Sequence, residues 1–249
     1  MIFWRFLATS AVFLILGISP IWAQSDCDRY PFEASAELSE IYEALSGTVA
    51  SYTGLAHSLN RDLTFCLTDT LLTERGYYEP DERTIVLARD MSPGLTLAVA
   101  VHELRHVEQF DVGICPSLDL SMKEHVRLVF AMEADASVTS LVVAADLRTQ
   151  GKPMMWNALA GWPMQADLAA RFDRILDETS DVGLAASAAF EAWYDSDVRR
   201  DSYYVAACSN YLDQIDREHP LPKYGSLSGA YFDDLCRLPD GRPYKCRGP

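Results

Sequence analysis

Residues 101–109 read Val-His-Glu-Leu-Arg-His-Val-Glu-Gln. The histidines of this stretch, His102 and His106, are four positions apart. On a helix they therefore lie on one face and can bind one metal ion together. Glu103 directly follows the first histidine, so its carboxylate can reach a water bound to that metal. The stretch predicts a helix that carries two metal ligands and a general base.

The flanking residues predict where this helix begins and ends. Ser92 suits the helix cap and Pro93 the first turn. Gly113 and Pro116 are expected to end the helix after about Phe110. The motif is thus expected in the middle of a complete helix.

The rest of the chain predicts a small sheet followed by helices. Apolar spacing indicates a helix over residues 35–58, and short β-prone runs indicate a strand over 63–67 and a hairpin of 76–79 with 84–87. A second long helix is expected over 121–149, and further helices near 164–178, 183–195 and 197–215. We therefore expect a predominantly α-helical α+β fold, with a small antiparallel sheet before the motif helix.

The first 23 residues are typical of a secretory signal peptide. Arg5 precedes a short apolar run, Leu7–Ile18, and Ala23 stands where cleavage is expected. An uncleaved N-terminal anchor is the alternative, and no membrane span is expected after residue 23. These features predict a secreted protein, most simply a periplasmic one.

Charge and cysteine content indicate which binding partners are disfavoured and in which kind of compartment the protein folds. The formal net charge of −15 disfavours binding to nucleic acid or to anionic lipid. An even number of cysteines after a signal peptide predicts up to three disulfides in an oxidising compartment. The six are Cys27, Cys66, Cys115, Cys208, Cys236 and Cys246. The sequence does not choose their pairing.

A catalytic zinc site needs a third protein ligand. Glu133 is our choice, because it lies mid-helix among small residues, where a buried carboxylate is costly unless it is paired or bound to metal. Asp135 and Asp111 are the alternatives. Arg105 and Glu108 are expected on the solvated face of the motif helix, where Arg105 could contact a substrate carboxylate.

His-Glu-x-x-His on one helix, followed by Glu133 in a Glu-Ala-Asp-Ala context, resembles the gluzincin class of zinc metallopeptidases. The chain is also similar to a poorly characterised bacterial metallopeptidase family. The likeness covers about residues 63–145 and implies a zincin-like domain over 24–219. The remaining Pro/Gly-rich tail, 220–249, is expected to be irregular and tethered by a disulfide.

The resemblance implies a zinc-dependent endopeptidase that binds one Zn²⁺ through His102, His106 and Glu133. A zinc-activated water would hydrolyse the peptide bond, with Glu103 as general base. Such folds often use a downstream Tyr or His to stabilise the oxyanion, and the candidates here are Tyr203, Tyr204 and His219. Both tyrosines could equally be packing aromatics.

The resemblance also implies a substrate that is a peptide or protein, lying along the strand of residues 84–87 as an added β-strand. The alternative is a catalytically silent relative that serves as a binding module in the envelope. Serine-hydrolase and phosphate-loop signatures are absent from the sequence. The oligomeric state is left open.

Overall fold

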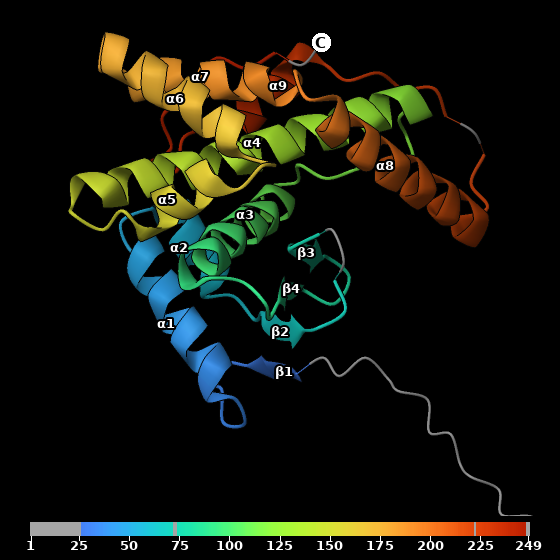
Figure 1. Ribbon diagram of the computed structural model, residues 1–249. Helices are drawn as coiled ribbons and strands as arrows, with labels where there is room; N and C mark the ends of the chain where they lie inside the picture. Colours follow the sequence, from blue (N-terminus) through green and yellow to red (C-terminus); the bar gives the residue numbers. More distant parts are fainter. Residues whose placement is uncertain (1–25, 72–73, 222, 248–249) are drawn as a thin grey trace, which may run out of the picture.

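The computed structural model describes residues 26–71, 74–221 and 223–247. The predicted signal peptide lies outside the described residues. Figure 1 shows the sheet together with α1, α2 and α3 on one side of the long helix α4, and α6, α7 and α9 on its other side. The predicted α+β class with mostly helical content is confirmed.

The sheet contains four strands in the order β1-β2-β4-β3. β2 pairs parallel with β4, whereas β1 with β2 and β3 with β4 pair antiparallel. The predicted hairpin of β3 and β4 is confirmed, but the expected purely antiparallel sheet is wrong because β4 inserts between β3 and β2. The strands are β1 (Asp26–Arg29), β2 (Thr64–Thr68), β3 (Gly76–Glu79) and β4 (Thr84–Ala88).

Two N-terminal helices replace the single helix expected over residues 35–58. α1 spans Ala36–Val49 and α2 spans Thr53–Leu59. Between them Tyr52 has an extended backbone, with φ −106° and ψ 97°, and its hydroxyl donates a hydrogen bond to Asp146 on α4 at 2.6 Å. This bond anchors the break between α1 and α2 to α4, and nothing in the local spacing of apolar residues predicts it.

The two long helices that the sequence predicted are present. α3 spans Pro93–Asp111 and begins at Ser92, whose side chain accepts a hydrogen bond from the Leu95 N–H. α4 spans Met122–Thr149 and begins at Ser121 in the same way. By length and composition α4 could cross a membrane, but 83% of its most apolar window is buried inside the protein. α4 is therefore the core helix of this fold.

The C-terminal half consists of further helices, several of which pack on α4. The tail, expected to be irregular, also contains a short helix, α9. The helices are α5 (Met154–Gly161), α6 (Ala166–Thr179), α7 (Val182–Trp193), α8 (Asp197–Glu218) and α9 (Gly229–Leu235). Figure 1 shows α8 crossing one end of α4.

Two disulfides form, fewer than the three that six cysteines allow. Cys27–Cys66 joins β1 to β2, and Cys236–Cys246 closes a loop in the tail. Cys115 and Cys208 are free thiols. The predicted tether of the tail is therefore a bond between its own two cysteines.

Close packing of α3 against α5 gives a test of the fold. A Cβ atom at Gly94 would lie 2.5 Å from the backbone oxygen of Met154, so Gly94→Ala is expected to lower the free energy of unfolding by about 1–3 kcal/mol. Gly47→Ala on α1 is the control, because its Cβ would meet no described atom within 4 Å. Urea unfolding of both variants checks this, and equal stabilities would contradict the close approach.

Candidate metal centre

The predicted ligands come together where the middle of α3 faces the middle of α4. His102 Nε2 lies 3.1 Å from Glu133 Oε2, and His106 Nε2 lies 3.4 Å from Glu133 Oε1. The two Nε2 atoms are 3.2 Å apart. One ligand atom from each residue lies within 4.8 Å of the others. The structure thus brings together the three residues that the sequence proposed as ligands.

These separations fit a tetrahedral metal ion. With metal–ligand bonds of about 2.0–2.1 Å, neighbouring ligand atoms around zinc lie roughly 3.3 Å apart. Two imidazoles and one carboxylate are also a known ligand set of catalytic zinc, and they leave the fourth position open. The side chains of His102 and Glu133 keep 14% and 15% of their surface exposed, so solvent can reach the site.

The charged groups of the site strongly perturb one another. Burial lowers the pKa of His106, but the Glu133 carboxylate outweighs burial and raises that pKa to about 9. Burial opposes ionisation of Glu133, yet both histidines hold its pKa well below the usual range. A metal ion must therefore displace a proton from this group.

Glu103 lies beside the three ligands and is buried. Burial raises the pKa of its carboxyl, while His102 and His106 oppose that shift. A carboxylate of raised proton affinity next to a metal site is suited to accept and return a proton.

The rival third ligands are engaged elsewhere. Asp135 is fully buried and accepts hydrogen bonds from Arg105, Gln109 and Tyr244. Asp111 pairs with two arginines of other segments, Arg61 and Arg83. Of the three carboxylates weighed, Glu133 faces the histidines.

Gln109 is a site residue that the sequence analysis missed. Its Oε1 atom lies 2.8 Å from His106 Nδ1, so the amide accepts a hydrogen bond from the ring nitrogen that faces away from the metal position. The available signal was spacing, because Gln109 is three residues after His106 and therefore adjacent to it on the helix.

Of the three oxyanion candidates, Tyr203 is the one that lies at the site. Its ring packs on Trp193 at 5.4 Å, and its hydroxyl is near enough to Glu133 to interact with that carboxylate. Burial raises the pKa of this hydroxyl well above its ordinary value, and the charges of Glu133 and Glu103 add to that shift. Tyr203 therefore stays protonated and can donate a hydrogen bond.

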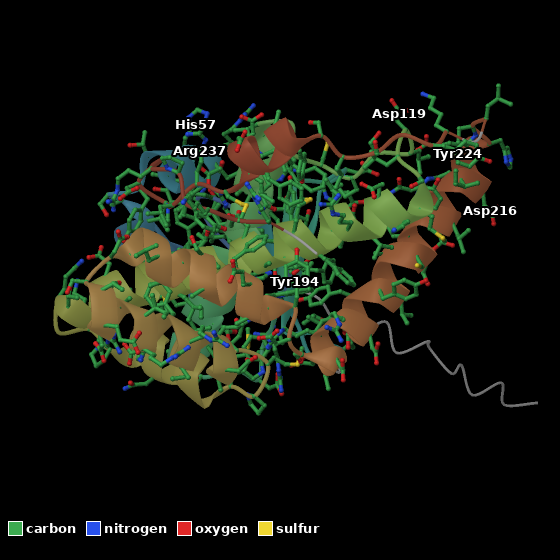
Figure 2. All side chains as sticks on the ribbon, turned by 90° about the horizontal axis from the view of Figure 1, so that it is seen from above. His57, Asp119, Tyr194, Asp216, Tyr224 and Arg237 are labelled. Carbon is green, nitrogen blue, oxygen red and sulfur yellow. A yellow bond between two sulfur atoms is a disulfide. The ribbon has the colours of Figure 1, made fainter. Side chains whose placement is uncertain are left out.

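Tyr204 and His219 lie away from the site. Tyr204 is 54% exposed and interacts with Cys208 on the outer face of α8. His219 follows the last residue of α8. Figure 2 shows Asp216, in the last turn of α8, at one edge of the molecule, whereas Tyr194, which precedes the helix, lies near the middle of the view. The distance along α8 separates His219 from the ligands.

Arg105 was expected on the solvated face of the motif helix, and this prediction is wrong. It is buried, and it bonds Asp135 at 2.7 Å and also pairs with Glu108. Its guanidinium further donates to the carbonyl oxygens of Leu235 and Arg237 in the tail. The tail covers this face of α3, so Arg105 is a structural residue.

A family model described as "Putative metallopeptidase family (DUF6782)" matches residues 21–246. Neither a curated protein nor a solved structure matches the chain. A metallopeptidase family implies a bound metal ion, and among the described residues the group of His102, His106 and Glu133 could hold one. Because the match extends over most of the sequence, the chain belongs to this metallopeptidase family.

Proposed function

We propose that the protein is a zinc-dependent peptidase of gluzincin type, which hydrolyses peptide bonds at the His102/His106/Glu133 centre. One observation carries this proposal: the Nε2 atoms of His102 and His106, 3.2 Å apart, lie 3.1 and 3.4 Å from the two carboxylate oxygens of Glu133, and the carboxylate of Glu103 is beside them. Bound zinc would polarise the substrate carbonyl and acidify a water.

The roles of the chain's own residues follow from their positions. Glu103 would take a proton from the attacking water at its carboxylate oxygen and then deliver it to the leaving amine. A binding module has no need of such a base, so the intact Glu103 favours an enzyme over the silent alternative.

Tyr203 is our proposed oxyanion donor. Its protonated hydroxyl interacts with Glu133 and with the charge of Glu103. A hydroxyl fixed at this point would donate a hydrogen bond to the negative oxygen that forms when water attacks the carbonyl.

An edge strand near the site supports a peptide as substrate. The prediction that residues 84–87 form this edge is wrong, because β4 is buried between β2 and β3. Among the described strands β1 and β3 form the two edges of the sheet, and β3 is the edge strand that packs against α3. A Cβ at Gly76 of β3 would touch Val99, which lies one helical turn before His102. An extended peptide added to β3 would therefore run close to the metal ligands.

Two disulfides indicate an oxidising, extracytoplasmic environment. We extend the proposal to secretion into the periplasm, with the signal-peptide pattern of residues 1–23 as support.

Metal removal tests the proposed activity. Protein purified without chelator is expected to contain one equivalent of zinc and to cleave a mixed peptide library. Chelator should reduce cleavage to background, and one equivalent of Zn²⁺ should restore it. Zinc below half an equivalent, with cleavage that survives chelation, would contradict the proposal.

A further inference from the structure

A chain of hydrogen bonds leads from the metal ligand His106 to the C-terminal tail. His106 Nδ1 lies 2.8 Å from Gln109 Oε1, and Gln109 Nε2 donates to Asp135 Oδ2 at 2.9 Å. Asp135 Oδ1 accepts from the hydroxyl of Tyr244 at 2.7 Å. The four side chains are buried, so water does not compete for these bonds.

The hydrogen bonds from His106 to Tyr244 can be assigned donors and acceptors in only one consistent way. Gln109 Nε2 also donates to the carbonyl oxygen of Met132 at 3.2 Å, and both of its partners are oxygens that only accept. The amide nitrogen therefore faces these two oxygens, and Oε1 faces His106. Because Oε1 can only accept, Nδ1 carries the hydrogen, and the lone pair of a neutral His106 resides on Nε2. Nε2 is the atom that faces Glu133.

The outer end of the chain is held by the tail. Tyr244 lies inside the loop that the Cys236–Cys246 disulfide closes. The same loop is fastened to α3 where Arg105 donates to the carbonyl oxygen of Arg237. Arg105 also bonds Asp135 Oδ2, so it supplies the positive charge that the buried carboxylate requires.

We propose that Gln109, Asp135 and Tyr244 are positioning residues that fix the tautomer and orientation of His106, and that the disulfide-closed loop 236–246 is part of the metal site. This inference rests on the proposed zinc binding. The tail, which is far from the motif in sequence, would then affect metal affinity through these hydrogen bonds. A loop that merely covers the core would affect stability alone.

Zinc affinity, measured by chelator competition, tests the chain at both ends. Tyr244→Phe removes one hydroxyl and keeps the ring, so it is expected to weaken Zn²⁺ binding about tenfold. Gln109→Met, at the inner end, is expected to weaken it roughly 10–100-fold. Both variants should also shift the visible spectrum of the Co²⁺-loaded protein, which responds to ligand geometry and not to stability.

Tyr231→Phe is the matched control. Tyr231 is a second tyrosine of the tail, and its buried hydroxyl has no hydrogen-bond partner among the described residues. Its substitution should leave the zinc affinity and the Co²⁺ spectrum unchanged. Melting temperatures of the metal-free proteins separate binding from stability.

The two proposals fail in different ways. Wild-type protein that binds no Zn²⁺ would remove the proposed function and this inference together. Zinc affinity retained within twofold in Gln109→Met would overturn the inference alone, and affinity retained within twofold in Tyr244→Phe would remove the tail from it. Gln109→Met leaves the Tyr244 hydroxyl in place, so it tests the inner end of the hydrogen-bond chain even if Tyr244→Phe does not fold.

Discussion

Glu103→Gln is expected to lower kcat for peptide hydrolysis by roughly 10²–10⁴-fold while one equivalent of zinc stays bound. The amide keeps the size of the carboxyl group but cannot take up a proton from water. Glu103 is near the ligands without being one, because the atoms that converge come from His102, His106 and Glu133. Steady-state kinetics with metal analysis of the same sample measures both effects.

Glu40→Gln is the control for the Glu103 substitution. Glu40 is exposed on α1, and the same loss of one negative charge there should leave kcat unchanged. Cleavage by Glu103→Gln at the wild-type rate would remove Glu103 as the base. Loss of zinc together with activity would instead place Glu103 among the groups that hold the metal.

The candidate ligand group could be proposed from the sequence because its signals are local. Two histidines four apart on a helix need no tertiary information to face the same way. Glu133 could be proposed because a carboxylate on an apolar helix requires a partner. The structure adds the separations between the three ligand atoms, which the sequence could not provide.

The burial of Arg105 could not be predicted from the sequence. Helical spacing places it away from the face of the two histidines, and a charged side chain there is normally solvated. It is buried because a segment 130 residues later in the chain covers it. The role of Gln109 depends on the same long-range packing, since Asp135 and Met132 on α4 orient its amide.

The sheet was predicted in part for a similar reason. The β3–β4 hairpin could be predicted from its turn, because its pairing is local. The parallel pairing of β2 with β4 could not be predicted in this way, because it depends on β3 lying at an edge of the sheet with β4 between β3 and β2. The position of that edge decides which strand an extended peptide could join.

Arg105→Met is expected to lower the free energy of unfolding by about 3–5 kcal/mol, because it leaves the buried Asp135 carboxylate without its cation. For a chain of this size the melting temperature should fall by roughly 10 °C. Methionine retains much of the apolar volume, so most of the loss would be electrostatic. Measuring metal-free protein keeps zinc binding out of the comparison.

Arg29→Met provides the comparison for the Arg105 substitution. Arg29 pairs with Asp62 at 3.1 Å, but the two side chains are 57% and 78% exposed, so this variant should change stability by less than about 1 kcal/mol. Equal stabilities of the two variants would mean that Arg105 does not compensate Asp135. A large loss confined to Arg105→Met would show that the buried Arg105–Asp135 ion pair holds α3 to α4, while the same guanidinium binds the tail. The proposed metal ligand His106 is the next residue of α3.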